Sequence, residues 1–462
     1  MKKISVLLTL TALLASTACD ELVDIKPQNV IPEAEAVKTT ADLQKLLIRA
    51  YSAAQSGALY GGNFVAFSEM LADNATGANS FGFSQIQSFS FTFFNPDGRS
   101  TWTDAYNVVN LANTAIDRMP EVNDGDIAAQ RDRLRGEALF LRAAMHFELV
   151  RFFALPYGAR PTNSQPGIPL RLQSVQDVNN IQKLPRATVQ EVYAQVLKDF
   201  TEAASLLPAT NSARATSWAA KAYLARVYFQ MNDFQNAYAQ ANDVVSNGLS
   251  GAGARLALNA SVLNRYRTKN SPESIFEMQS TNFDNSSGGL EGYFRQAGNT
   301  PQLYATPELA ALALADPNDQ RGRLLYNTRA VGANQRTFTT RYDQVNQNAP
   351  VLHLAELLLI RAESAAELNN LTTAAADLQR VLDRAYGAGR KTAPTAKADL
   401  LAQIRAERRL EMAFENNRVH ELKRLRQPVR GLPWDCPKLL FFIPDVEING
   451  NPAIEQNQSA GC

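Results

Sequence analysis

Histidine and cysteine are scarce in this 462-residue chain, which contains only three of each. None of the three histidines has a second histidine or a cysteine at helical spacing, and no His-Glu-x-x-His occurs, so no metal site is predicted. The sequence also lacks the Gly-x-Ser-x-Gly pattern of an activated serine and the spacing of a phosphate-binding loop. We therefore expect neither a catalytic constellation nor a cofactor. A pair of glycosidase carboxylates that meet only in the folded chain remains open.

An excess of charge of one sign is also absent. The chain has 46 basic and 45 acidic residues, which leave a formal net charge of +1. No overall field exists to attract nucleic acid or an anionic membrane surface, so no nucleic-acid partner is expected. A basic cluster near the C-terminus is interpreted as a solvated helix face: Arg418, Lys423, Arg424, Arg426 and Arg430.

Long hydrophobic runs are missing as well. The apolar run at residues 4–15 follows Lys2 and Lys3 and is far shorter than the ~20 residues that cross a bilayer. Residues 1–18 are therefore predicted to be a signal peptide. Cys19 follows three small residues and resembles the acylated cysteine of a bacterial lipobox, which predicts a lipid anchor. The alternative is an ordinary cleavage site with an incidental cysteine.

The two remaining cysteines, Cys436 and Cys462, are separated by 26 residues. An exported chain folds where disulfides form, so this pair is a candidate disulfide. The sequence does not show whether the two Cα atoms come within bonding reach, so the pairing stays open.

Helical periodicity is the main structural signal in what the chain does contain. Apolar residues recur at helical spacing in the segments 39–56, 188–207, 216–247, 351–386 and 397–426. Two of these segments read as helix, turn, helix, and each has a pair of alanines 12 residues apart: Ala225 with Ala237, and Ala362 with Ala374. Small residues at fixed places let two antiparallel helices approach closely, which is typical of tetratricopeptide-like pairs.

Two segments lack this periodicity. Residues 57–100 and 249–350 are rich in Gly, Asn, Ser and aromatic residues, and we expect loops with short strands there. A hundred residues without periodicity inside a compact protein usually form a functional loop region or a small insertion.

A column of like charges marks the last predicted helix. Glu407, Glu411 and Glu415 recur at every fourth residue, and such a column is unfavourable unless basic groups interleave with it. We predict that arginines from neighbouring helices complete a network with these carboxylates, with Arg142 and Arg361 as candidates.

Four motifs together carry a family resemblance: RGEALFLRA at 135–143, Glu356 with Ala362-Glu363, ERRLEMAFENNR at 407–418 and FIPDVEINGNPAIEQN at 442–457. The chain resembles the SusD/RagB family of Bacteroidetes outer-membrane lipoproteins. The resemblance implies a mainly α fold, a tetratricopeptide-like helical superhelix with an irregular loop-rich inserted region. It also implies that residues 19–462 form a single SusD-like domain.

The same resemblance implies a function. Similar proteins are not enzymes; they lie on the cell surface, anchored to the outer membrane, and deliver oligosaccharides to a SusC-like TonB-dependent transporter. The alternatives are uptake of peptides, as in the RagB branch, a tetratricopeptide-type interaction scaffold, and a surface hydrolase.

Sugar capture requires flat aromatic faces for the C–H side of each ring and amide or charged groups for the hydroxyls. Both segments without periodicity offer such residues. The predicted ligand-binding residues are Tyr60, Asn63, Asn79, Phe81 and Phe83 in the first segment, and Asn282, Phe283, Tyr293, Phe294 and Arg295 in the second.

Overall fold

The computed structural model describes residues 37–77, 80–175, 181–285, 288–297, 301–458 and 462. The predicted signal peptide and Cys19 lie outside these residues. The longer helices are α3 (Thr40–Ala54), α4 (Asn63–Leu71), α6 (Pro96–Arg118), α7 (Ile127–Phe153), α8 (Val189–Leu206), α9 (Ser217–Gln230), α10 (Phe234–Asn247), α13 (Pro307–Leu314), α15 (Leu354–Glu367), α16 (Leu371–Tyr386) and α17 (Lys397–Glu411). The shorter ones are α5 (Phe81–Gln87), α11 (Asn264–Arg267), α12 (Leu290–Phe294), α14 (Gln320–Leu325), α18 (Arg418–Arg424) and α19 (Asp445–Gly450), with 3-10 turns η1 (Met119–Glu121) and η2 (Pro437–Leu439).

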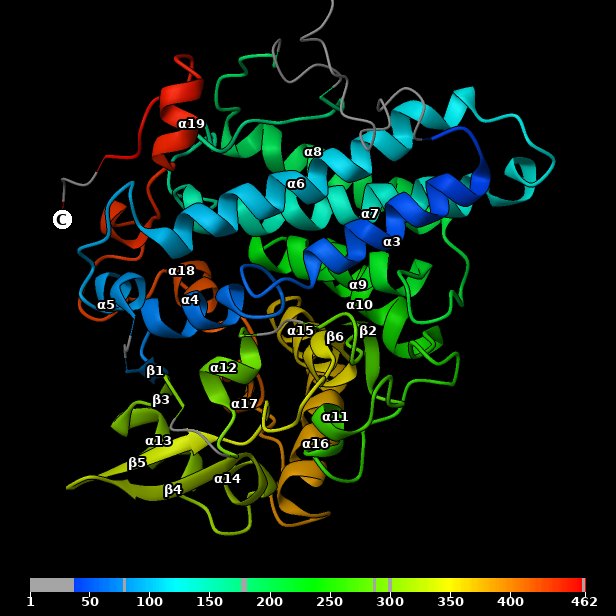
Figure 1. The fold of residues 1–462 in the computed structure, drawn as a ribbon. Helices are drawn as coiled ribbons and strands as arrows, with labels where there is room; N and C mark the ends of the chain where they lie inside the picture. Colours follow the sequence, from blue (N-terminus) through cyan, green and yellow to red (C-terminus); the bar gives the residue numbers. More distant parts are fainter. Residues whose placement is uncertain (1–36, 78–79, 176–180, 286–287, 298–300, 459–461) are drawn as a thin grey trace, which may run out of the picture.

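These helices pack in a winding order. The helix α7 lies between α6 and α8, α9 packs on α8 and α10, and α15 packs on α10, α16 and α17 (Figure 1). One cluster of buried apolar residues runs through this succession, from Val37 to Ile454. The prediction of a mainly helical, tetratricopeptide-like fold is confirmed.

The two predicted helix pairs are α9 with α10 and α15 with α16. In each pair an asparagine with positive φ makes the turn, Asn232 at 59° and Asn369 at 64°. The next residue, Asp233 or Asn370, accepts a hydrogen bond from the first turn of the second helix and so caps it. The four alanines at 12-residue spacing are fully buried, which allows the close approach.

The first segment without periodicity is more helical than predicted. All nine residues of α4 are buried, so this helix has no polar face and leaves no amphipathic stripe in the sequence. Residues 249–350 are irregular, as predicted, and contribute most of the three two-stranded antiparallel sheets. These pair β1 (Ala75–Thr76) with β3 (Tyr304–Ala305), β2 (Ser274–Met278) with β6 (Ala349–His353), and β4 (Tyr326–Val331) with β5 (Asn334–Thr339).

The predicted helix at 397–426 is wrong in one respect, because it breaks between α17 and α18. Phe414 and Asn416 adopt positive φ at this break. The buried carboxylate of Glu69 accepts hydrogen bonds from the backbone N–H groups of Phe414, at 3.0 Å, and of Asn417 and Arg418, at 3.4 Å. A side chain from α4 therefore replaces the missing helical acceptors, and no local signal in 397–426 reports it.

The glutamate column is buried and paired, as predicted, but with other arginines. Glu411 accepts from Arg265 and from Arg384, at 2.5 Å, and Glu407 accepts from Arg321, also at 2.5 Å. Glu415 contacts His353 Nε2 at 2.7 Å. The predicted partners bind elsewhere: Arg142 pairs with Asp199 and Arg361 with Asp377. We call Arg265, Arg321, Arg384, Glu273, Glu407, Glu411 and Glu415 the buried ion network.

The basic cluster near the C-terminus is not a uniformly solvated face. Arg424 is buried and donates to Glu363, at 3.0 Å, and to Glu421, at 2.8 Å. Lys423 is also buried and donates to the carbonyl oxygen of Leu439. The interpretation from sequence was wrong because it took account of charge alone, whereas Glu363 on the distant helix α15 lets Arg424 enter the interior and a carbonyl oxygen accepts from Lys423.

The chain's C-terminal end is fastened by a disulfide between Cys436 and Cys462, whose Cα atoms are 5.9 Å apart. The two cysteines whose pairing the sequence left open are therefore bonded to each other in this structure. Among the described residues, no helix has the length and hydropathy required of a membrane span.

We predict that Glu411→Gln lowers the free energy of unfolding by about 3–5 kcal/mol, because it leaves three buried guanidinium groups with too little negative charge. Chemical denaturation measures this change. Glu308→Gln on the exposed face of α13 is the matched control and should change stability by less than about 0.5 kcal/mol. Equal free energies of unfolding for the two variants would show that the buried ion network does not stabilise the fold.

The network also predicts the response to acid. Burial alone would raise the pKa of Glu415, but His353 and Arg265 lower the pKa to about 2, from an ordinary value of 4.5. As pH falls from about 4.5 to 2, the unfolded chain takes up a proton that the folded chain does not, so stability falls. Denaturation midpoints at pH 7, 5 and 3 should show this loss, and Glu415→Gln should show a smaller one. If the denaturation midpoint falls equally with pH in the wild type and in Glu415→Gln, the loss of stability does not come from Glu415.

Candidate functional site

The segment 279–285, which we call the β2 loop, carries the chain from a buried strand to the surface. All five residues of β2 are buried, and the turn that follows is held by Thr281. The Thr281 hydroxyl accepts from the N–H of Asp284 at 2.9 Å and of Phe283 at 3.2 Å. This turn places Phe283 at the tip, where its side chain is 101% exposed.

Two contacts fix the β2 loop to its neighbours. The hydroxyl of Ser52 on α3 donates to Asp284 Oδ1 at 2.8 Å. On the other side, the Asn346 amide donates to Asn282 Oδ1 at 2.6 Å. Both ends of the turn are therefore tied to elements far away in the sequence, and the exposed ring is carried on a supported backbone.

A cavity of about 180 Å³ lies between the β2 loop and α3. Its lining combines aliphatic and aromatic surface with amide, carboxylate and guanidinium groups: Ile48, Tyr51, Ser52, Gln55, Ser212, Ala213, Arg214, Glu277, Met278, Gln279 and Asp284. We call it the Glu277 cavity. A smaller, amide-rich hollow borders the other side of the loop and is lined by Ser280, Asn285, Leu290, Glu291, Tyr342, Gln344, Asn346 and Gln347.

The carboxylate of Glu277 is the chemically distinctive group of this cavity. Its Oε2 accepts from the Asn270 N–H at 3.0 Å and from the Asn348 amide at 2.6 Å. Its Oε1 is buried and accepts no hydrogen bond from any described residue. Burial raises the pKa of Glu277. A hydroxyl or amide N–H that entered the cavity could donate to this oxygen, and doing so would relieve the cost of leaving it unpaired.

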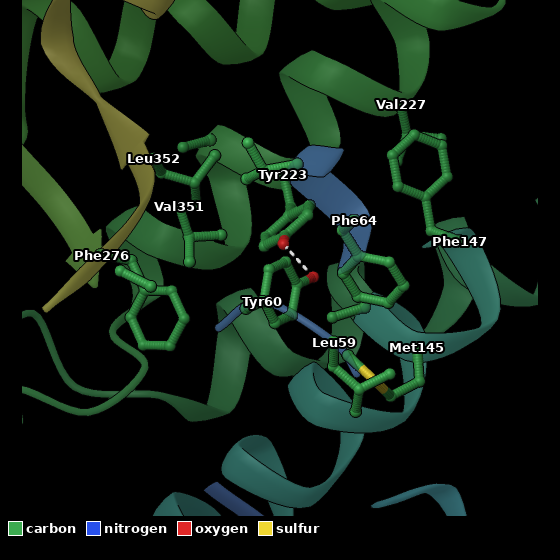
Figure 2. Packing of buried hydrophobic residues seen from close by; sticks show 14 of the residues in the cluster. Leu59, Tyr60, Phe64, Met145, Phe147, Tyr223, Val227, Phe276, Val351 and Leu352 are labelled. Atoms are coloured by element: carbon green, nitrogen blue, oxygen red, sulfur yellow. Dashed lines mark hydrogen bonds between the residues drawn. The ribbon is translucent and has the colours of Figure 1, made fainter. Parts of the chain in front are cut away.

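Four of the predicted ligand-binding residues lie in the interior instead. Tyr60 points towards Tyr223, with the two hydroxyl oxygens 2.5 Å apart, among the buried side chains of Figure 2. Asn63 donates to Thr101, and Phe83 and Phe294 are at most 1% exposed. These side chains pack in the core, so they do not form a ligand surface.

The other predicted residues are placed differently. Tyr293 is half-buried and donates to Asn63 Oδ1 at 2.8 Å, and Arg295 pairs with Glu291 at 2.7 Å. Asn282 and Phe283 lie together in the β2 loop. Asn79 and the side chain of Phe81 are outside the part of the chain that the structure describes.

Sequence reasoning missed the acidic and amide side chains of the cavity, Glu277, Asp284, Gln279 and Gln55. One signal could have found the first of them. Glu277 interrupts the apolar run Ile275-Phe276-Glu-Met278, and a single carboxylate within a buried strand needs a reason to be there. No group of three or more metal-ligating side chains occurs within the described ranges.

The arrangement favours binding of a neutral, polyhydroxylated or amide-rich ligand. An exposed aromatic face covers apolar C–H surface, and amides and carboxylates beside it accept and donate hydrogen bonds. The ionic groups of the lining are Glu277, Asp284 and Arg214, and Arg214 already pairs with Glu137. The cavity therefore disfavours an anionic ligand and suits a neutral one.

Comparison with known proteins gives consistent matches along the chain. Residues 21–229 match the family model described as "Starch-binding associating with outer membrane", and residues 230–451 match the model of the SusD family. "SusD-like protein P2" of Formosa agariphila is 25% identical, over 90% of this chain and 89% of its own. "SusD-like protein P38" of the same organism is 24% identical over 99% of both chains.

Solved structures share the fold. A SusD superfamily protein from Bacteroides thetaiotaomicron superposes with a TM-score of 0.81 at 23% identity, covering 91% of this chain and all of that one. A structure described as a laminarin-binding SusD-like protein gives a TM-score of 0.75 at 22% identity, over 92% of this chain and all of its own. Together with the two family models, these matches show that the chain belongs to the SusD/RagB family.

Proposed function

We propose that this protein binds an oligosaccharide nutrient at the β2 loop and the Glu277 cavity. The observation that carries the proposal is the fully exposed Phe283 ring beside a polar cavity in which a buried carboxylate oxygen has no described partner. An aromatic platform next to hydrogen-bonding groups is the combination that sugars require. Membership in a family whose model description names starch binding supports the same ligand class.

The ligand we propose is a neutral glucan fragment. One related fold is described as laminarin-binding and another as a putative sugar-binding protein from Bacteroides vulgatus. The Glu277 cavity, at about 180 Å³, is too small for more than one sugar ring, so a longer chain would extend along the exposed loop past Phe283. A peptide is the alternative, since the amides of Asn282 and Asn346 could also pair with a peptide backbone.

We further propose that the mature protein is held on the outer membrane by a lipid on Cys19 and delivers its ligand to a SusC-like TonB-dependent transporter. The lipobox-like position of Cys19 and family membership support this assignment. In this role the protein is a binding protein rather than an enzyme. A stable helical frame with a ligand site on one loop suits capture and release, which require no chemistry on the ligand.

Phe283→Ala should weaken binding of laminarin oligosaccharides by about three- to tenfold, because it removes the aromatic platform from a fully exposed position. Calorimetric titration measures the affinity. Phe94→Ala is the matched control, since Phe94 is 63% exposed on a different part of the surface, and it should bind like the wild type.

The same titration distinguishes the alternatives. Equal affinity of Phe283→Ala and the wild type would contradict this location of the site. Binding of peptides but of no laminarin or starch fragment would contradict the oligosaccharide proposal and favour the peptide alternative.

The transporter proposal predicts that the tagged full-length protein, solubilised in mild detergent from its native membranes, co-purifies with a large β-barrel protein. A Cys19→Ala variant should lose this association, because it cannot be acylated. Mass spectrometry of the purified material identifies the partner. Recovery of soluble partners alone would contradict delivery to a transporter and favour an interaction scaffold.

A further inference from the structure

A second cavity, of about 360 Å³, lies at the C-terminal end of the fold, apart from the β2 loop. Its walls are the segment 155–166 after α7, the segment after Cys436, and the tail residues 455–458. We call it the tail cavity. In Figure 1 the C-terminal segment with α19 lies at the upper left, well apart from the strand β2 near the centre right, and the linings of the two cavities share no residue. The tail cavity is therefore separate from the site proposed above, and the inference made here does not depend on that proposal.

The walls of the tail cavity are held together by one arginine. The half-buried Arg186 donates to the carbonyl oxygens of Gly167, at 2.7 Å, and Glu455, at 3.2 Å. It also donates to Asn457 Oδ1 at 2.8 Å. The disulfide between Cys436 and Cys462 fastens the same tail further on. The cavity is thus a built feature of the fold, with walls cross-linked to one another.

The charge of Arg186 is not neutralised by its neighbours. All of its acceptors are carbonyl or amide oxygens, and no carboxylate of a described residue lies within 4 Å of it. Burial lowers the pKa of Arg186 to about 10, so the group remains charged at neutral pH. Such a site attracts an anion, since a cation in a poorly solvated position gains most from a nearby negative charge.

Two further side chains of the cavity could contact a ligand directly. Arg160 is exposed at the cavity and uses one N–H for the carbonyl oxygen of Ala159, so its remaining donors can take a carboxylate in the bidentate manner. Gln165 is only 5% exposed; its amide nitrogen donates to Pro156, and its Oε1 has no described partner. This oxygen can accept a hydrogen bond from a hydroxyl.

We propose that the tail cavity binds a small hydroxylated carboxylate, the chemistry of a uronic acid. Arg160 binds the carboxylate, Gln165 accepts from a hydroxyl, and Arg186 supplies a fixed positive charge behind them. Glu455 also lines the cavity, so its ionic groups sum to one positive charge, which matches one carboxylate. The volume lies near the lower end of the range for small-molecule sites and suits one or two sugar rings.

Calorimetric titration of the full-length protein with D-glucuronate tests this proposal. Glucuronate should bind, acetate should bind more weakly because it has no hydroxyl for Gln165, and D-glucose should bind at least tenfold more weakly because it has no charge. Arg160→Gln should weaken glucuronate binding by about tenfold or more, and Ser164→Asp should weaken it by placing a negative charge in the lining.

Two control variants make the outcome specific. Arg323→Gln, an exposed arginine on α14, and Phe283→Ala, in the β2 loop, should both bind glucuronate like the wild type. Absence of glucuronate binding, equal affinity for glucose, or unchanged affinity in Arg160→Gln would each overturn the proposal. Loss of glucuronate binding in Phe283→Ala would also overturn it, since the ligand would then occupy the β2 loop.

Discussion

The structure depends on burying many ion pairs where its helices meet. Arg265 and Arg384 reach the same two carboxylates, Glu273 and Glu411, and so connect α11, α16 and α17 with the strand β2. Taking these groups out of water is costly, and the cost is recovered only when every partner is in place. The network therefore favours one arrangement of the helices over others that bury similar apolar area.

The same network explains why the sequence motifs look as they do. The glutamates at 407, 411 and 415 and the arginine at 408 belong to one motif, and each has an interior partner on another element. Glu356 pairs with Arg226 of α9, and Glu363 pairs with Arg424 of α18. The motifs at 356–363 and 407–418 thus supply charges that assemble the frame, which is why they say nothing about the ligand.

The packed helices and the buried ion network fix the position of the candidate site. The strand β2 runs through the interior beside the buried ion network, since Glu273 precedes it directly, and the β2 loop begins directly after Met278, the last buried residue of the strand. The loop's ends are tied to α3 and to Asn346, and the backbone N–H of Phe283 donates to Thr281, so the exposed Phe283 ring is carried on an ordered backbone. A rigid base with one exposed aromatic ring needs little reorganisation when a ligand binds.

Local features were predictable from the sequence, and long-range ones were not. The capping residues, the turn asparagines and the alanines 12 residues apart all lie within a single helix pair. Both pairs could therefore be predicted from a short stretch of sequence. One partner of Glu411 is Arg265, 146 residues away, and many arginines were equally plausible. Likewise, aromatic residues in an irregular segment can pack inside or face solvent: Phe283 is exposed, whereas Phe83 and Phe294 are buried. Only tertiary packing separates these cases.

Hydrogen–deuterium exchange with and without laminarin oligosaccharides tests the central claim most directly. If buried ion pairs hold a rigid frame that presents a ligand on one loop, amides of α15 and α17 should exchange most slowly and should not respond to the ligand. Amides of residues 279–285 should exchange faster and become protected when the ligand binds. Fast exchange in α15 and α17, or protection that spreads through them while the loop is unaffected, would contradict the account.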